Sequence, residues 1–283
     1  MDYRQIIWLA SYPKSGNTWV RCFLDAYFLG DVDINEMLAS SSDDVAHLHQ
    51  MSDGSDIAKL PIDIQQLTRP MAMARLVSMH NHTRKGTIPL FVKTHQPHMI
   101  ANGIELLPEC LTKATVYLVR DPRDVLPSYA KHMGCDLDQG LEWMQDKYRT
   151  LAGNENRIGE LLSSWDAHVN SYINADTHNV MWVLYEDLLQ DPEKYFTKIL
   201  EHSGVTPDPE RVKKAIEVTR LDNLKRQEEK KGFSESSPHA KNQFFGEGGS
   251  KNRAKLSPKH IHRIEKAFGR MMKRIGYLKQ RVA

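Results

Sequence analysis

Short, almost wholly apolar runs alternate along the chain with longer stretches in which apolar residues recur at helical spacing. The apolar runs predict strands over residues 5–10, 89–94, 114–120 and 179–185. The helical spacing predicts helices over residues 17–29, 122–133, 157–174, 191–203, 208–218, 220–230 and 258–276. Because strands that alternate with helices form parallel sheets covered on both faces, the pattern predicts an α/β fold with a central parallel sheet flanked by helices.

Two polar stretches show only fragments of such a pattern. Residues 31–88 are rich in Asp, Ser, His and Met, and residues 232–256 are rich in Gly, Ser, Asn and Lys. We expect both to be mobile, the first as a lid or pocket wall and the second as a loop that orders over a ligand. A length of 283 residues fits either one large or two modest domains, and we favour a single domain over residues 1–283.

The charge balance limits the classes of partner. The chain carries 38 Lys and Arg against 36 Asp and Glu, a formal net charge of +2, which does not favour a nucleic-acid surface. No apolar run approaches the length that crosses a bilayer, and no basic segment followed by a long apolar stretch opens the chain. We therefore expect a cytoplasmic protein with neither a nucleic-acid nor a membrane partner.

The distribution of cysteine and histidine does not favour a metal site. Cys22, Cys110 and Cys135 are widely spaced and form no CxxC pair. Histidines two positions apart occur at 47 and 49, at 80 and 82, and at 260 and 262. Such pairs diverge on a helix, and no pattern of cysteine or carboxylate accompanies them, so we expect no metal.

The most informative segment joins the first predicted strand to the first predicted helix. It reads Tyr12-Pro13-Lys14-Ser15-Gly16-Asn17-Thr18-Trp19. The first N–H groups of a helix lack intrahelical partners and carry partial positive charge, so anionic oxygens fit there. Lys14 adds a full charge, Ser15 and Thr18 add hydroxyl donors, and Gly16 allows close backbone approach. An ordinary strand-to-helix turn is the alternative, and the other motifs must decide.

A second motif ends the strand predicted at residues 89–94. Phe91 and Val92 are followed by Lys93, Thr94 and His95. The carboxyl ends of parallel strands meet at one edge of a sheet, so this motif and the Lys14 loop should face one crevice. There His95 is a candidate general base, with a structural histidine as the alternative.

A third motif, Val116-Tyr117-Leu118-Val119-Arg120-Asp121-Pro122-Arg123-Asp124, is followed by Ser128. An apolar strand again ends in charge, and Pro122 suits the first turn of a helix. The planar fork of Arg120 matches phosphate oxygens. The alternative is a strand-end network of ion pairs in which Arg120 or Arg123 binds Asp121 or Asp124.

Together the three motifs give the chain a resemblance to the cytosolic-type sulfotransferases that use 3'-phosphoadenosine 5'-phosphosulfate (PAPS), and among them to bacterial tailoring members. The resemblance implies a P-loop-like sulfotransferase fold and a donor that leaves as 3'-phosphoadenosine 5'-phosphate (PAP). It implies that His95, Lys14, Lys93 and Ser128 are catalytic. It implies that the donor is bound by Lys14, Ser15, Gly16, Asn17, Thr18, Trp19, Arg120, Ser128, Tyr185, Thr219, Leu221, Gly246 and Gly248.

The chain departs from the family at two places. Where the family carries Arg-Lys-Gly, this sequence has Phe244-Phe245-Gly246-Glu247-Gly248, so the arginine expected on the 3'-phosphate is missing. Lys251 and Arg253 are the candidate substitutes. The Lys-Thr-Val dimerisation motif is not evident, which leaves a homodimer possible but unsupported.

The resemblance implies transfer of a sulfuryl group from PAPS to a hydroxyl or phenol of a small-molecule acceptor, with no metal required. The acceptor pocket is expected from residues 31–88 and 134–156, with Trp143 and Tyr148. A P-loop nucleotide kinase or NTPase is the rival enzyme, but its fingerprint places lysine after the second glycine, whereas Lys14 precedes Gly16. A protein that only binds a nucleotide is the third alternative.

Overall fold

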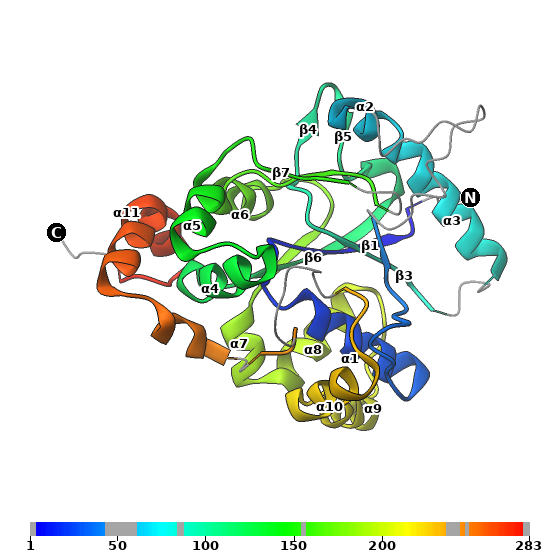
Figure 1. Cartoon of the computed structure of the whole chain (residues 1–283). Coiled ribbons are helices and arrows are strands. Elements are labelled where there is room, and N and C mark those ends of the chain that lie inside the picture. The colour runs from blue at the N-terminus through cyan, green and yellow to red at the C-terminus, as the bar shows by residue number, and fades with distance from the viewer. Residues whose placement is uncertain are drawn as a thin grey trace.

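A five-stranded parallel sheet lies at the centre of the molecule (Figure 1). The computed structural model describes residues 4–42, 61–83, 88–153, 157–235, 244–246 and 249–279. Across the sheet the strands are β2 (Ser40–Ser41), β3 (Leu90–Thr94), β1 (Ile6–Ser11), β6 (Thr112–Val119) and β9 (Val180–Leu184). Every neighbouring pair is parallel. The prediction of an α/β fold with a central parallel sheet is confirmed.

Helices cover both faces of the sheet because successive side chains of a strand point to opposite faces. In β1, Ile6, Trp8 and Ala10 join one buried apolar cluster, and Ile7 and Leu9 join the other. The first cluster draws on α3 (Arg69–Thr83), α4 (Pro122–Met133), α5 (Leu137–Gln145), α6 (Trp165–Ile173) and α11 (Pro258–Arg274). The second draws on α1 (Asn17–Leu29), α7 (Tyr185–Gln190), α8 (Pro192–His202) and α9 (Pro209–Val218).

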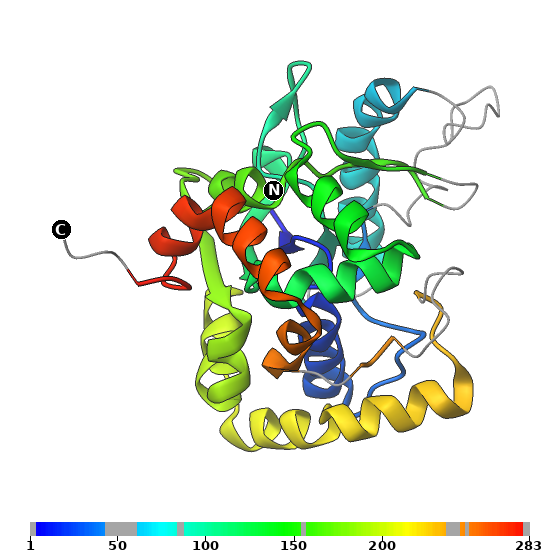
Figure 2. The same cartoon turned by 60° about the vertical axis from the view of Figure 1, so that its left-hand side comes forward.

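The remaining elements surround these two layers. They are α2 (Ile62–Leu67), α10 (Leu221–Lys231), the two-residue strands β4 (Ile100–Ala101), β5 (Ile104–Glu105), β7 (Thr150–Leu151) and β8 (Glu160–Leu161), and 3₁₀ helices over Glu109–Leu111 and Gly249–Lys255. Figure 2 shows α10 running along the base of the molecule, beneath α1. A third buried cluster joins Cys22 of α1 to Leu224 of α10, so α10 packs against the helix that follows the Lys14 loop.

The helix predicted over residues 157–174 is wrong in its first half, because α6 begins only at Trp165. Upstream of it, β8 pairs in antiparallel fashion with β7, and Ser163 adopts a left-handed conformation (φ +64°) that an α-helix does not accommodate. The N–H groups of Leu162 and Ser163 both donate to the carbonyl of Arg149. Pairing with this distant segment outweighs the local helical spacing.

The two polar stretches contain more regular structure than the sequence indicated. Residues 31–88 include β2, α2 and the 15-residue helix α3. Residues 232–256 include the 3₁₀ helix Gly249–Lys255. His47 and His49 lie outside the described residues, as does Gly248. Within the described part of the chain, no helix has the length and apolar character needed to cross a membrane.

Candidate active site

A cavity of about 1210 Å³ opens at the carboxyl edge of the sheet. The segments that directly follow β1, β3, β6 and β9 all contribute to its wall, as expected for the edge at which parallel strands end. Among the residues predicted for the site, those that line it are Lys14, Gly16, Asn17, Thr18, Trp19, Lys93, His95, Arg120, Ser128, Tyr185, Thr219, Leu221 and Gly246. The expectation that the three motifs face one crevice is confirmed. Ser15 is buried and is not among the residues that line the cavity.

The loop between β1 and α1 is shaped by two residues with positive φ, Lys14 at +68° and Gly16 at +102°. Gly16 is the N-cap of α1, and a Cβ there would stand 2.5 Å from Cδ2 of Tyr185. Asn17, which the resemblance implies for donor binding, donates from Nδ2 to the Leu9 carbonyl at 2.8 Å. Its amide nitrogen therefore fixes the loop to β1, which leaves its backbone N–H as a donor towards an anion.

Lys14 is the most perturbed cation of the site. Its Nζ lies 3.5 Å from the centroid of the Phe244 ring, a cation–π contact. Burial, together with the neighbouring cations Arg120, Lys93 and Lys131, lowers the pKa of Lys14 to about 7. An anion bound here would restore the charge of the lysine, so the loop is poised for a negatively charged ligand.

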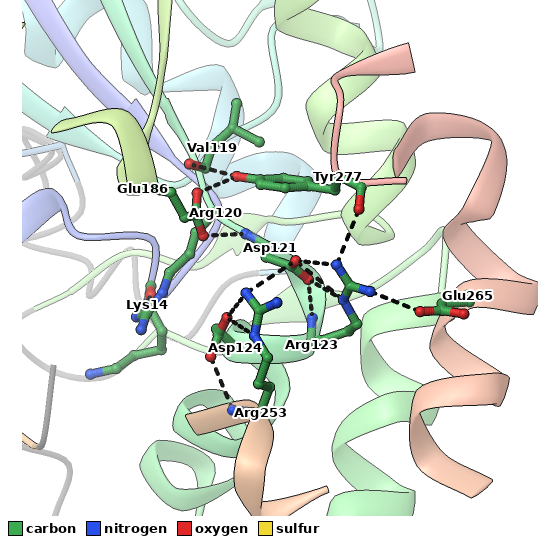
Figure 3. Close-up of polar contacts among 10 residues, drawn as sticks. All are labelled: Lys14, Val119, Arg120, Asp121, Arg123, Asp124, Glu186, Arg253, Glu265 and Tyr277. Atoms are coloured by element: carbon green, nitrogen blue, oxygen red, sulfur yellow. Dashed lines mark hydrogen bonds and ion pairs between the residues drawn. The ribbon is translucent and has the colours of Figure 1, made fainter. Parts of the chain in front are cut away.

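Arg120 connects the third motif to the loop. Its guanidinium donates to the Lys14 carbonyl at 3.0 Å and lies over the ring of Tyr185, 4.5 Å from the centroid. Figure 3 shows Arg120 directed toward Lys14, away from the Arg123 side chain. Arg120 is thus directed to the Lys14 loop, whereas the ion pair considered above as the alternative forms between Arg123 and Asp121.

Arg123 does belong to such a network (Figure 3). It binds the buried Asp121 through Nε and Nη2 and reaches Glu265 of α11 at 2.8 Å. Asp121 also caps α4 by accepting from the Arg123 N–H at 2.9 Å. The motif thus divides into Arg120, which lines the cavity, and Arg123, which joins α4 to α11.

Arg253 enters the same network, although the sequence proposed it as a substitute on the 3'-phosphate. Its backbone N–H and Nε donate to the fully buried Asp124 at 3.0 and 2.9 Å, and it does not line the cavity. Asn252 and Lys255 from the same 3₁₀ helix do line it. The side chain of Lys251 lies outside what the structure describes. Lys255 is therefore a better placed cation than Arg253.

Glu235 is a cavity residue that the sequence did not reveal. Its carboxylate binds Arg21 at 2.6 Å and Lys93 at 3.3 Å. Burial raises the pKa of Glu235, but the Lys93 and Arg21 cations outweigh burial and bring it to about 2. Lys93 is therefore held at the end of β3 by an ionised carboxylate from the segment after α10.

His95 has the tautomer that a general base requires. Its Nδ1 lies 2.7 Å from the Ser11 carbonyl, which can only accept, so Nδ1 carries the hydrogen and Nε2 the lone pair. The main-chain N–H of His95 donates to Glu160 at 3.1 Å. The orientation of the ring is thus set by β1 and the position of its backbone by β8.

Helix α6 holds the segment that contains His95. Tyr117 donates to Nδ1 of His168 at 2.8 Å, and Nε2 of His168 donates to the His95 carbonyl at 2.9 Å. Tyr172 donates to the Gln96 carbonyl at 2.6 Å. Burial lowers the pKa of His168 to about 4, so this ring is neutral near pH 7. The spacing of four between His168 and Tyr172 on a predicted apolar helix was the only sequence signal for this arrangement.

The remaining predicted donor residues form one wall of the cavity. Trp19 packs edge-on against Tyr185 and against Phe196, with centroids 6.2 and 5.2 Å apart. The hydroxyl of Thr219 donates to the Ala215 carbonyl at 2.7 Å, so towards a ligand it can only accept. Leu221 begins α10 and contributes an apolar side chain.

The histidine pairs considered for metal binding are placed on helices. His80 and His82 lie on α3, and His260 and His262 lie on α11, where residues two apart diverge. Among the described residues, no three or more His, Cys, Asp or Glu side chains gather in a way that could hold a metal ion.

Comparison with known families and proteins bears on this arrangement. The family model described as the sulfotransferase domain matches residues 4–276. Sulfotransferase 1B1 of Mus musculus is 25% identical over 226 residues, and sulfotransferase 1A1 of Bos taurus is 24% identical over 225. Both alignments cover 77% of this chain and only 64% and 65% of those relatives. The chain therefore spans just under two thirds of their length.

Two solved structures share the fold. The retinol dehydratase complex with androsterone and PAP gives a TM-score of 0.62 at 17% identity, over 96% of this chain and 82% of that one. Mouse sulfotransferase SULT7A1 complexed with PAP gives 0.58 at 16% identity, over 98% and 86%. At such low sequence identities, the similarity shows the fold alone.

Proposed function

Because the chain belongs to the sulfotransferase domain family, whose model it matches from residue 4 to residue 276, we propose that it is a cytoplasmic, PAPS-dependent sulfotransferase. It transfers a sulfuryl group from PAPS to a hydroxyl or phenol of a small-molecule acceptor. The observation that carries the proposal is the convergence of Lys14, Lys93, His95 and Arg120, from three strand ends, on one cavity. The solved structures of the same fold were determined with PAP.

The donor fits the residues that line the cavity. The first-turn N–H groups of α1, with Lys14 and Thr18, would bind the 5'-phosphosulfate. The Ser15 hydroxyl is buried without a hydrogen-bond partner in the described structure, which supports an oxygen ligand at this loop. Arg120 and Ser128 would bind the 3'-phosphate. The adenine would lie along the wall formed by Trp19, Tyr185, Thr219, Leu221 and Gly246. Gly248, which the resemblance also implies for donor binding, lies outside the described residues.

The proposed reaction is an in-line displacement at sulfur. Nε2 of His95 takes the proton of the acceptor hydroxyl, whose oxygen forms the new bond to sulfur as the bond from sulfur to the 5'-phosphate oxygen breaks. Lys14 stabilises the charge that develops on the leaving phosphate, and Lys93 contacts the transferring group. By analogy with phosphoryl transfer, positioning and charge stabilisation supply most of the rate. The products are PAP and a sulfate ester.

A P-loop kinase would differ in its ligand. A terminal phosphoryl group carries more negative charge than a sulfuryl group, and kinases offset that charge with magnesium. A measurement of melting temperature distinguishes the kinase from the sulfotransferase, because a ligand that binds only the folded protein raises that temperature. We expect PAP to stabilise the protein and Mg-ATP to have little effect. Stabilisation by Mg-ATP alone would support the kinase.

Turnover tests the reaction itself. Incubation with PAPS labelled in the sulfuryl group and a panel of phenols and alcohols should transfer label to at least one acceptor class. If PAP stabilises the protein but no acceptor of either class is labelled, the protein only binds the nucleotide and the proposed activity is wrong.

A further inference from the structure

Arg149 stands on the cavity wall without a partner of opposite charge. It directly precedes β7 and lines the same cavity as Lys14 and His95. Its guanidinium lies over the Trp143 ring, 4.2 Å from the centroid, and the side chain is partly buried. Within the described part of the chain, no carboxylate forms an ion pair with it, and its buried Nε has no hydrogen-bond partner.

Two other arginines with buried or partly buried side chains do have carboxylate partners. Arg21 binds Glu235, and Arg123 binds Asp121 and Glu265. Arginine stays protonated in proteins, so a partly buried guanidinium cannot avoid the cost of desolvation by losing its charge. A cation held on a cavity wall without a protein counter-ion is therefore suited to an anionic group of a ligand.

Two tyrosine hydroxyls lie close to Arg149. The hydroxyls of Tyr12 and Tyr129 are buried, and the two ring centroids are 6.0 Å apart. The two hydroxyls interact with each other, and that of Tyr129 also interacts with Arg149. Burial raises the pKa of both hydroxyls, so both keep their hydrogens, while the Arg149 cation acts on both in the opposite direction. One guanidinium and two phenols thus provide hydrogen-bond donors in one region, of which Tyr129 and Arg149 line the cavity.

This group of donors lies on the His95 side of the Lys14 loop. Leu151, two residues beyond Arg149, pairs with Glu160, which accepts from the His95 N–H. Tyr12 packs edge-on against His168, which donates to the His95 carbonyl. The cations that lower the pKa of Lys14 are Arg120, Lys93 and Lys131, and Arg149 is not among them. The cations around Lys14, which would bind the donor, and Arg149 therefore line different parts of the cavity.

We propose that Arg149 and Tyr129 form an acceptor subsite that binds a carboxylate, so that the acceptor is a hydroxy acid rather than a neutral phenol or alcohol. The planar fork of one arginine matches a carboxylate, whose single charge it neutralises. The inference rests on the proposed function, because it names the class of acceptor that receives the sulfuryl group near His95. Tyr12 lies behind Tyr129 and supports it.

The experiment compares hydroxy acids with their methyl esters. A panel that includes 4-hydroxyphenylacetate and 3-hydroxybenzoate, each paired with its methyl ester, is assayed for label transfer from PAPS by the unmodified protein and by the Arg149→Met variant. We expect the acids to exceed their esters in kcat/KM, and the variant to lose about 10- to 100-fold toward the acids, the range of a charge-assisted contact. The esters should change less than about twofold. Arg274→Met, an exposed change on α11, is the matched control.

A binding measurement separates this proposal from the activity. The protein saturated with PAP is titrated with each acid and ester by calorimetry, which requires no turnover. Tighter binding of the acids, lost in Arg149→Met, supports the subsite even if no compound of the panel is sulfated. Equal binding of acids and esters by the unmodified protein overturns it, whatever the outcome for sulfation. Weaker binding of PAP itself to the variant also overturns it, because Arg149 would then serve the donor.

Discussion

Nε2 of His168 donates to the main-chain oxygen of His95 at 2.9 Å, and the hydroxyl of Tyr117 fixes the tautomer that makes this possible. The proposed general base is therefore held from both sides, at its ring by Ser11 and at its backbone by α6. His168 does not line the cavity, so under this proposal it acts through His95 as a positioning residue.

Removing the Tyr117 hydroxyl tests this role. In Tyr117→Phe the His168 ring is no longer fixed in one tautomer, and we expect kcat to fall about tenfold, as small misplacements of a catalytic group do. KM for PAPS should change by less than about twofold. The rise in melting temperature caused by PAP should change by less than about 1 °C, roughly the scatter of such comparisons. Tyr27→Phe is the matched control, since it removes a buried hydroxyl that accepts from the Asp208 N–H at 3.0 Å and takes no part in holding His95. Equal losses in kcat from both variants would mean a general effect on the fold.

His95→Ala should abolish sulfation and leave donor binding nearly intact. Without the lone pair on Nε2, no group of the protein takes the proton of the acceptor hydroxyl, and we expect kcat to fall about 10²- to 10⁴-fold. The measurements are label transfer from PAPS and the melting shift with PAP. Unchanged turnover would contradict the role of base, and loss of the PAP shift would instead place His95 in donor binding.

The depressed pKa of Lys14 predicts how PAP affinity depends on pH. In the donor-free protein Lys14 loses its proton as the pH rises through about 7, whereas a bound anion raises its pKa. Binding above pH 7 therefore takes up a proton, and affinity should fall between pH 7 and 9, at most about tenfold per pH unit. The phosphates of PAP, with a second pKa near 6, are already ionised there.

Calorimetry in two buffers of different ionisation enthalpy measures the proton uptake on binding of PAP. Lys14→Met should bind PAP more weakly at pH 7 and should lose both the uptake and the pH dependence. A pH dependence that persists in this variant would assign the titration to another group.

Much of the fold and of the cavity could be predicted because the information is local. Four of the five strands of the sheet are apolar runs, and Lys14, Lys93 and Arg120 lie at or within three residues of the ends of three of them, so the parallel arrangement alone brings these residues together. The error over residues 157–174 has the opposite origin. There the β7–β8 pairing and the positive φ of Ser163 depend on a partner segment that helical spacing does not encode.

The partners of the site residues were not predictable for the same reason. Lys93 and Glu235 are 142 positions apart, and His95 and His168 are 73 apart. Hydropathy identifies which positions are buried but not which polar side chains meet. Phe244 was visible only as a departure from the family, and its contact with Lys14 gives that departure a physical role.

Arg120 and Arg123, three positions apart, should behave differently when each is replaced by methionine. Arg120→Met removes a cation from the cavity and should abolish most of the melting shift caused by PAP. Arg123→Met leaves Asp121, 1% exposed, without its principal counter-ion. Losing one partner of a buried pair costs about 3 kcal/mol or more, a fall of roughly 5–10 °C in melting temperature. The PAP shift should survive in this variant, and its loss would contradict the division of the motif.

Alanine substitutions at Gly16 and Gly30, which lie at the two ends of α1, distinguish the cost of a left-handed backbone from the cost of a steric clash. Both have positive φ, +102° and +87°, but a Cβ at Gly16 would stand 2.5 Å from the Tyr185 ring, whereas a Cβ at Gly30 meets nothing within 4 Å. Gly30→Ala should therefore cost only the left-handed conformation, about 1 kcal/mol. Gly16→Ala must also displace Tyr185, over which Arg120 packs. We expect a larger fall in melting temperature and a weakened PAP shift for Gly16→Ala. Equal effects in the two variants, with PAP binding retained in both, would show that Tyr185 is free to move and that its contact with Gly16 does not shape the donor site.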